Sequence, residues 1–148
     1  MREYHRSATV PYAPESVFDL IADVDSYAEF VSGGTASCVE PAAPAHGDEH
    51  EVLATLAIVL GAQAGRFTTR NRLEPPHRIR MSLVTGPFST LEGEWRVEPL
   101  TDGGSRLELD MRFKFASRLK DMLLGPVFEV TCGQLVNAFL KRARKLYG

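Results

Sequence analysis

The chain has 148 residues, of which 44% are hydrophobic and 24% are charged. This length suits one domain spanning residues 1–148, and the composition is that of a globular protein rather than a disordered one. The 17 Lys and Arg residues nearly balance the 19 Asp and Glu residues, which gives a net charge of −2. That balance argues against a surface adapted throughout to nucleic acid, and no DNA partner is expected, while a local basic patch stays open.

The first part of the chain predicts one strand followed by two short helices. Polar and apolar residues alternate up to Val10, as they do in a strand. Pro14 then opens a helix, because the first helical turn does not use the N–H that proline lacks. Apolar residues at helical spacing continue this helix to Val24, and a second, weaker helical segment is expected from Asp23 to Phe30.

From residue 36 to residue 115 the pattern predicts one strand after another. The expected strands are 36–40, 49–60, 66–73, 78–83, 90–97 and 106–115, with turns at Pro41–Gly47, Gly61–Gly65 and Gly86–Phe88. Alternation is clean in the last four strands, which places charged side chains on one face and apolar side chains on the other. The sequence therefore predicts an antiparallel sheet of about seven strands with one apolar face.

A long helix is predicted from Ser117 to Tyr147. Its apolar residues fall on one broad stripe: Leu124, Phe128, Cys132, Leu135, Val136, Phe139, Ala143 and Leu146. A kink or break is expected at Gly125-Pro126, because proline removes an N–H and crowds the preceding turn. Only this helix is long enough to cover the sheet, so the fold class is α+β, a curved sheet wrapped around a long C-terminal helix with room for a cavity.

No group of residues predicts catalysis or metal binding. Cys38 and Cys132 lie far apart without metal-ligand spacing, and two reduced thiols are expected. The histidines are expected on the outward face or in turns: His5, His46, His50 and His77. The carboxylates of the polar face are expected to pair with arginines across strands: Glu92, Glu94, Glu108 and Asp110. Binding is therefore favoured over enzymatic activity, and no cofactor is required.

The inner face of the predicted sheet and helix is the candidate ligand site. In such sites an apolar lining holds the body of the ligand, and a few polar groups orient its head. The candidate lining residues are Phe67, Thr69, Asn71, Met81, Leu83, Trp95, Met111, Phe113, Phe128, Cys132, Val136 and Phe139. A polyprenyl quinone, an aromatic polyketide or a fatty acyl chain would fit this lining. The alternative is a packed core whose polar groups bond to the backbone.

Two surface features could contact a partner. Apolar residues away from the main helix stripe predict a cavity mouth, or a contact with a membrane or partner: Tyr27, Phe30, Pro87, Phe88, Leu123 and Val127. The end of the long helix carries four cations: Lys141, Arg142, Arg144 and Lys145. These cations suit the negative end of the helix dipole, and they would also attract anionic lipid headgroups or RNA.

Several short segments occur together in the order found in a known family. They are Val10-Pro11-Tyr12, Asp23–Tyr27, Phe67–Asn71, Leu83–Phe88, Gly93-Glu94-Trp95, Ala138-Phe139 and Arg142-Ala143. Over essentially the whole chain they resemble the coenzyme Q-binding START-domain family of the polyketide cyclase/dehydrase (SRPBCC) superfamily, and most of all its RatA group of ribosome-association toxins. The chain has Ser32 and Gly34 where this family usually carries a proline and often a cysteine.

The resemblance implies a helix-grip fold that holds a polyprenyl quinone such as ubiquinone, in support of respiration. For the RatA group it implies binding to the large ribosomal subunit, which hinders subunit association, and here the helix end and the arginines of strand 66–72 would make the contact. A polyketide aromatase/cyclase is a third alternative, which needs a charged side chain pointing inward from strand 66–73 or 106–115. The N-terminus lacks a secretory signal, so a cytoplasmic protein with peripheral contact at the inner membrane is expected.

Overall fold

The computed structural model describes the backbone of residues 1–23, 34–46, 49–60 and 63–148, and the side chains of residues 1–23, 51–57 and 65–148. Within these ranges the strands are β1 (Arg2–Val10), β2 (Gly34–His46), β3 (Glu49–Leu60), β4 (Gln63–Glu74), β5 (Arg78–Thr85), β6 (Phe88–Pro99) and β7 (Ser105–Phe115). The helices are α1 (Pro14–Ala22) and α3 (Arg118–Tyr147).

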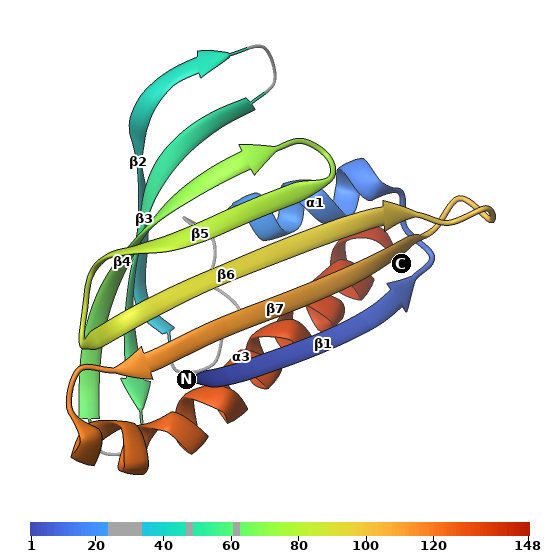
Figure 1. Ribbon diagram of the computed structural model, residues 1–148. Helices are drawn as coiled ribbons and strands as arrows, with labels where there is room; N and C mark the ends of the chain where they lie inside the picture. Colours follow the sequence, from blue (N-terminus) through green and yellow to red (C-terminus); the bar gives the residue numbers. More distant parts are fainter. Residues whose placement is uncertain (24–33, 47–48, 61–62) are drawn as a thin grey trace.

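The strands form one antiparallel sheet in the order β1-β7-β6-β5-β4-β3-β2. The first strand of the chain therefore pairs with the last, while every other neighbouring pair is joined consecutively. Figure 1 shows the sheet curving around α3, which lies along its inner side, and α1 packs beside the C-terminal half of α3. This architecture confirms the predicted fold class.

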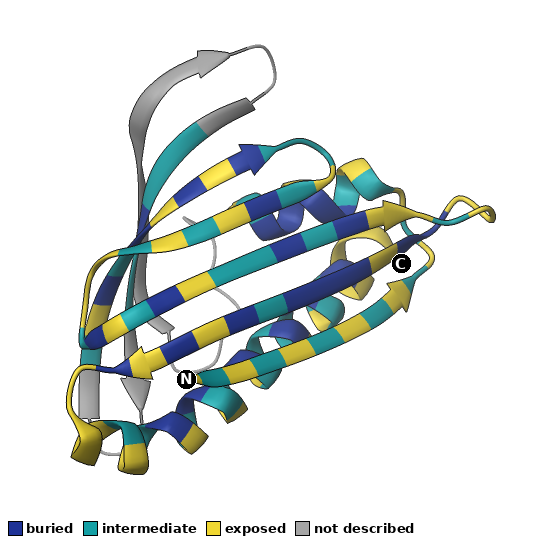
Figure 2. Cartoon of the chain, viewed as in Figure 1, coloured by how far each residue is buried: buried dark blue, intermediate teal, exposed yellow. Residues whose placement is uncertain are grey.

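The alternation of the sequence corresponds to the two faces of the sheet. On β7 the apolar side chains face inward and are buried: Leu107, Leu109, Met111, Phe113 and Phe115. The charged residues between them face outward, and Figure 2 shows the resulting bands of buried and exposed residues along β5, β6 and β7. A shift of the register by one residue would bury the charged set, which explains why the register is well specified.

The helix α1 begins at Pro14 as predicted and buries four apolar side chains: Val17, Phe18, Leu20 and Ile21. It ends at Ala22. The second helical segment expected from Asp23 to Phe30 lies outside the described residues from residue 24 onward.

Three expected turns are partly or largely strand in the structure. The turn predicted at Pro41–Gly47 is wrong as far as His46, because β2 continues to that residue with register shifts on either side of Ala43. β2 is an edge strand, where proline removes no ladder hydrogen bond from a central position. Similarly, β4 already begins at Gln63, and β6 begins at Phe88, so both expected turns are shorter than predicted.

The helix α3 runs without a break through Pro126, so the predicted interruption is wrong. Pro126 is exposed, and Met122, whose carbonyl loses its helical partner, is 62% exposed. Water can therefore take the place of the missing N–H. At the start of the helix, the Ser117 Oγ accepts a hydrogen bond from the Lys120 backbone N–H at 3.0 Å, which is an N-cap.

The predicted apolar stripe of α3 faces the sheet. Five of its residues are buried: Phe128, Cys132, Val136, Phe139 and Ala143. Leu146 is 50% exposed and does not belong to the buried stripe. Among the described residues α3 is also the one helix whose length and composition would allow it to cross a membrane. In the apolar stretch that meets this criterion, 28% of the residues are buried inside the protein.

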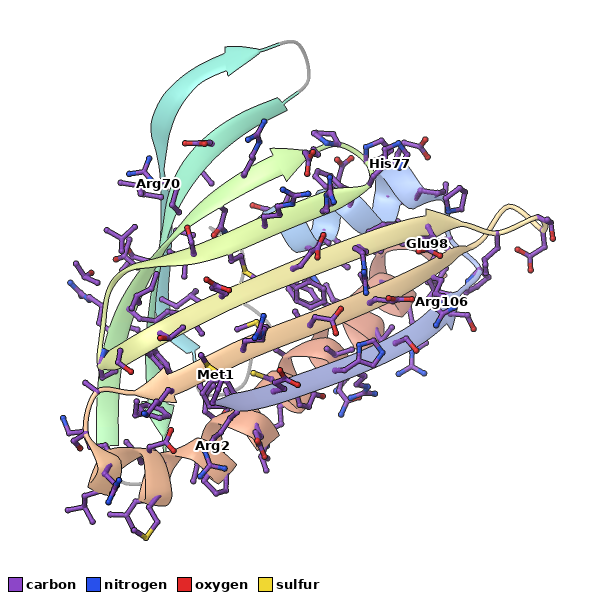
Figure 3. All side chains as sticks on the ribbon, viewed as in Figure 1. Met1, Arg2, Arg70, His77, Glu98 and Arg106 are labelled. Atoms are coloured by element: carbon purple, nitrogen blue, oxygen red, sulfur yellow. The ribbon has the colours of Figure 1, made fainter. Side chains whose placement is uncertain are left out.

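Two arginines on the inward side of β1 attach this strand to α3. Arg2 donates to the Asp121 carbonyl at 3.1 Å, and Figure 3 shows Arg2 beside the helix. Arg6 donates to the Gly133 carbonyl at 3.1 Å and to the Asn137 Oδ1 at 2.5 Å. These bonds hold the helix across the edge of the sheet, and the sequence analysis did not foresee them.

Candidate functional site

A strip of residues crosses the inner face of the sheet halfway along its strands. The register places Asn71 opposite Met81, Met81 opposite Gly93, Gly93 opposite Met111, and Met111 opposite Tyr4. Residues directly opposite each other on neighbouring strands point to the same face. These five residues from β4, β5, β6, β7 and β1 are called the inner strip.

At the centre of the inner strip, two methionine side chains lie over Gly93. A Cβ added to Gly93 would be 2.5 Å from the Met111 Sδ and 2.7 Å from the Met81 Cε. The two thioethers therefore fill the volume that a side chain at position 93 would occupy. Methionine has three rotatable bonds and adapts to irregular space, so this volume can be vacated without movement of the backbone.

At the β4 end of the inner strip, Asn71 and Thr69 form a buried polar pair. Their exposures are 6% and 5%, and the Thr69 hydroxyl donates to the Asn71 Oδ1 at 2.7 Å. The bond from Thr69 uses the Asn71 Oδ1, and the Asn71 side-chain nitrogen carries two donor hydrogens besides it. An amide donor on an apolar face fits a ligand that carries an acceptor oxygen.

Next to the inner strip, five phenylalanines form a closely packed cluster: Phe67, Phe88, Phe113, Phe115 and Phe128. The Phe113 and Phe128 ring centroids are 4.7 Å apart, and those of Phe88 and Phe115 are 4.6 Å apart. Three residues proposed as ligand lining are thus part of this aromatic cluster: Phe67, Phe113 and Phe128. Phe88 is 5% exposed, so its expected place at a cavity mouth is wrong. Its position at the start of β6 turns the ring inward.

The other predicted lining residues surround the strip. Trp95 packs edge-to-face on Phe139 with ring centroids 5.3 Å apart, and Leu83 is half-buried on β5. Cys132 and Val136 are buried on α3. Burial, with a smaller contribution from the charge of Glu129, raises the pKa of the Cys132 thiol to about 12. The thiol is therefore protonated at neutral pH, and Cys132 serves as an apolar surface rather than a nucleophile.

A separate small cavity lies between α1, α3 and β7. Its volume is about 10 Å³, and apolar residues line it: Val10, Val17, Leu20, Ile21, Leu107, Phe139, Leu140 and Ala143. A volume of this size holds about one water molecule, which would find no polar partner there. This cavity is a packing defect and not a ligand site.

The predicted mouth residues do not gather in one place. Leu123 is 62% exposed and belongs to an apolar patch on the N-terminal half of α3 with Leu119, Met122 and Val130. Val127 is half-buried against the core, and Pro87 is half-buried in the turn before β6. Tyr27 and Phe30 lie outside the described residues.

The outer face of β6 and β7 carries a network of ion pairs. The Arg96 Nη2 lies 2.6 Å from the Glu108 Oε2 and 2.7 Å from the Asp110 Oδ2, and the Arg106 Nε lies 2.9 Å from the Glu108 Oε1. Glu108 is 7% exposed because these two arginines cover it. The cross-strand pairing expected for the carboxylates is thus present for Glu94, Glu108 and Asp110. Glu92 is exposed on the same face.

The described charged side chains of β4 and β7 alternate with the buried apolar ones and so lie on the outer face. His5 bonds to the Asp110 Oδ1 at 2.6 Å and His77 is exposed, whereas the side chains of His46 and His50 lie outside the described residues. No cluster of metal-ligating side chains occurs in the described part of the chain.

At the end of α3, Lys141, Arg144 and Lys145 are exposed and Arg142 is half-buried. Arg144 and Lys145 lie in the last helical turn, where cations are favoured by the helix dipole.

An antiparallel sheet that grips a long C-terminal helix with an apolar inner face defines the START-like helix-grip class. A solution structure of the 18 kDa protein CC1736 from Caulobacter crescentus matches the fold with a TM-score of 0.81, 31% identity, and coverage of 100% of this chain and 99% of that one. The Zhui aromatase/cyclase from Streptomyces sp. R1128 matches with a TM-score of 0.81 and 22% identity, covering 97% of this chain and 94% of that one. The second likeness concerns the fold alone.

Sequence comparison identifies the family of the chain. The model of the family "Polyketide cyclase / dehydrase and lipid transport" matches residues 10–140, and the chain belongs to this family. The ribosome association toxin RatA of Vibrio cholerae is 37% identical over 148 residues, covering 100% of this chain and 99% of that protein. RatA of Pseudomonas aeruginosa is 39% identical over 145 residues, covering 97% and 96%. The mitochondrial coenzyme Q-binding protein COQ10 homolog B of Xenopus laevis is 28% identical over 150 residues, covering 99% of this chain and 59% of that protein.

Proposed function

We propose that the protein binds a hydrophobic ligand with a carbonyl head on its inner strip, and that this ligand is a polyprenyl quinone. The observation that carries the proposal is the buried amide of Asn71, on the same strip as two methionines that lie over Gly93. A quinone offers two carbonyl acceptors and an isoprenoid tail, and burial of such a tail gains about 0.8 kcal/mol per methylene-sized unit. The lipid-transport description of the family and the coenzyme Q-binding relative support this proposal.

In this proposal each residue of the site has a separate role. Asn71 donates to a quinone carbonyl, and Thr69 holds the Asn71 amide in place. Met81 and Met111 move aside to admit the ring. The tail follows the apolar side chains between the sheet and α3: Leu83, Trp95, Cys132, Val136 and Phe139. No side chain acts on the ligand chemically, so the protein shields and releases a cytoplasmic pool of quinone and needs no cofactor.

Replacing Asn71 by leucine is expected to weaken the binding of a short-chain ubiquinone by about tenfold, because the lost hydrogen bond contributes about 1–1.5 kcal/mol. The quenching of Trp95, which is the only tryptophan, reports the binding. A second ligand has the same tail but methylated ring oxygens in place of the carbonyls. Asn71→Leu and the parent protein should bind this second ligand with the same affinity. Lipid extracted from protein made in a ubiquinone-producing host should contain the quinone.

Ser82→Ala, on the outer face of β5, is the matched control and should bind as the parent protein does. The proposal fails if neither extracted lipid nor added quinone binds. The role of Asn71 fails if Asn71→Leu keeps the full affinity.

A second candidate function is association with the large ribosomal subunit. Two relatives named ribosome association toxin RatA, at 37% and 39% identity over nearly the whole chain, favour it. The exposed cations at the end of α3 would make the contact through ribosomal RNA phosphates. This function does not need the inner strip, so the two proposals can be tested separately.

Co-sedimentation with purified large subunits tests this second candidate. The protein is expected to sediment with the subunits at 50 mM salt and to be released as salt increases, because phosphate contacts release counterions. The double variant Lys141→Gln/Lys145→Gln should reduce the bound fraction several-fold. The variant Lys114→Gln/Lys120→Gln loses the same charge at the other end of α3 and should not. Absence of co-sedimentation at 50 mM salt would contradict the proposal.

A further inference from the structure

The β1 edge of the sheet carries a cation whose charge is not balanced by the groups to which it bonds. Figure 1 shows β1 running beside α3 at this edge. Arg2, Tyr4 and Arg6 alternate along β1 and share the face that is turned toward α3. The Arg6 guanidinium donates to the Gly133 carbonyl and to the Asn137 Oδ1, which are both neutral acceptors. These bonds use two of the five N–H groups of a guanidinium and leave its positive charge in place.

Arg2 lies on the same face of β1 and provides the contrast. Its Nε lies 3.4 Å from the Asp121 Oδ2, and its Nη1 lies 3.9 Å from the Glu129 Oε1, so two carboxylates of α3 balance its charge. Among the ion pairs that the described residues form, Arg6 takes part in none. Both arginines hold β1 against α3, but only the charge of Arg6 is available to an anion.

A glycine in the middle of α3 brings a further donor to the same point. A Cβ added to Gly133 would be 3.1 Å from the Tyr4 Oη and 4.0 Å from the Arg6 Nη1. Glycine is unfavourable inside a helix, and here it lets the tyrosine hydroxyl and the guanidinium approach the helix backbone. Three side chains thus present O–H and N–H donors at the boundary of β1 and α3, and they are called the seam donors: Tyr4, Arg6 and Asn137.

The seam donors lie between solvent and the interior. Arg6 is half-buried and Asn137 is exposed, so a charged group can reach them from water. The Tyr4 ring belongs to the inner strip, where it lies opposite Met111 and packs against the core. The seam donors are therefore continuous with the apolar inner face of the sheet.

We propose that the seam donors bind the carboxylate head of a long-chain acid, whose chain lies along the inner strip. A guanidinium and a carboxylate form paired, charge-assisted hydrogen bonds, and one arginine matches the single charge of a carboxylate. From β1 to β4 the strip crosses four strand spacings, which is about 19 Å and longer than a chain of twelve carbons. The inference rests on the proposed ligand site for the chain, but the head lies at the opposite end of the strip from Asn71.

Calorimetric titration with dodecanoate tests the inference. The parent protein is expected to bind dodecanoate, and to bind its uncharged methyl ester at least about tenfold more weakly, because the ester loses hydrogen bonds between charged groups. Asn137→Asp should weaken the binding of dodecanoate to a similar extent, since the new carboxylate neutralises Arg6 and repels the ligand. The same variant should bind the methyl ester as the parent protein does.

Asn137→Asp also separates an anion site from a purely structural role of Arg6. The contact between Arg6 and position 137 becomes an ion pair in this variant, so the urea midpoint should stay unchanged or rise. Gln134→Glu is the matched control, because Gln134 is exposed on α3 and the variant adds the same charge to the helix. Water screens exposed charges, so this control should keep the affinity for dodecanoate within about twofold.

The inference is overturned if dodecanoate does not bind, if the methyl ester binds as tightly as the acid, or if Asn137→Asp keeps the affinity of the parent protein. It is also overturned if Gln134→Glu loses as much affinity as Asn137→Asp, since the effect would then come from charge anywhere on the helix.

Asn71→Leu distinguishes this inference from the proposed function. The variant is expected to weaken quinone binding, but its affinity for dodecanoate should not change, because the head is bound at the other end of the strip. If dodecanoate binds as expected and no quinone binds, the seam donors keep their role and the proposed quinone is wrong. If quinone binds and dodecanoate does not, only the role of the seam donors is wrong.

Discussion

Replacing Phe113 by alanine is expected to lower the free energy of unfolding by about 3–5 kcal/mol. Phe113 is 0% exposed, and its ring centroid lies 4.7 Å from that of Phe128 and 6.3 Å from that of Phe88. These rings come from α3 and from two neighbouring strands, so they cannot collapse together into the space that alanine would leave. Urea unfolding followed by the fluorescence of Trp95 measures the loss.

Phe113→Leu is the control for this prediction. Leucine fills most of the volume but removes the edge-to-face contacts, which contribute about 0.5–1.5 kcal/mol, so a much smaller loss is expected. Because Phe113 was also a candidate ligand residue, the experiment separates the two roles. A loss of less than about 1 kcal/mol for Phe113→Ala would show that this part of the interior is open, and Phe113 would then return to the ligand lining.

The fold could be predicted largely because its strands have one solvent-exposed face and one buried face. The strand expected at residues 106–115 is β7 at Ser105–Phe115, since charged and apolar residues alternate there without exception from Arg106 onward. Such a pattern has one register that keeps the charges in water. The stripe of α3 was predicted for a similar reason, because one helical face must cover the apolar side of the sheet.

The wrong predictions of secondary structure concern prolines whose effect depends on their place in the tertiary structure. Pro41 usually ends a strand, but at the edge position of β2 it is tolerated. Pro126 usually interrupts a helix, but on the exposed side of α3 it is not incompatible with helix. Neither edge position nor exposure can be obtained from the residues around a proline.

The sequence predicted which residues of the candidate site lie on the inner face of the sheet, but not what each of them does there. Alternation placed Asn71, Met81 and Phe113 on the inner face, where the structure has them. It could not separate Phe113, which belongs to the aromatic cluster, from Asn71, which forms a buried polar pair with Thr69. That difference depends on how the side chains pack inside the sheet. Gly93 was not included in the predicted ligand lining, although a glycine within a strand is a signal for close approach by another group.

Replacing Gly93 by valine is expected to lower the free energy of unfolding by about 1–3 kcal/mol, because the new side chain overlaps the Met81 and Met111 thioethers. The same change should abolish quinone binding, since the valine occupies the volume that the methionines would otherwise yield to the ring. Urea unfolding and Trp95 quenching measure the two effects. Gly65→Val is the matched control, as an added Cβ there has no atom within 4 Å, and its stability should stay within about 0.5 kcal/mol of the parent.

A second substitution shows whether the cost at position 93 arises from the methionines. Met81→Ala alone should destabilise the protein, because it leaves a gap over Gly93. In the Gly93→Val background the valine fills that gap, so the two losses should not add, and a coupling of at least about 1 kcal/mol is expected. Additive losses would mean that the backbone of β6 is strained by valine directly. In that case the space over Gly93 could not open by movement of side chains, and a quinone ring would have no way into the inner strip.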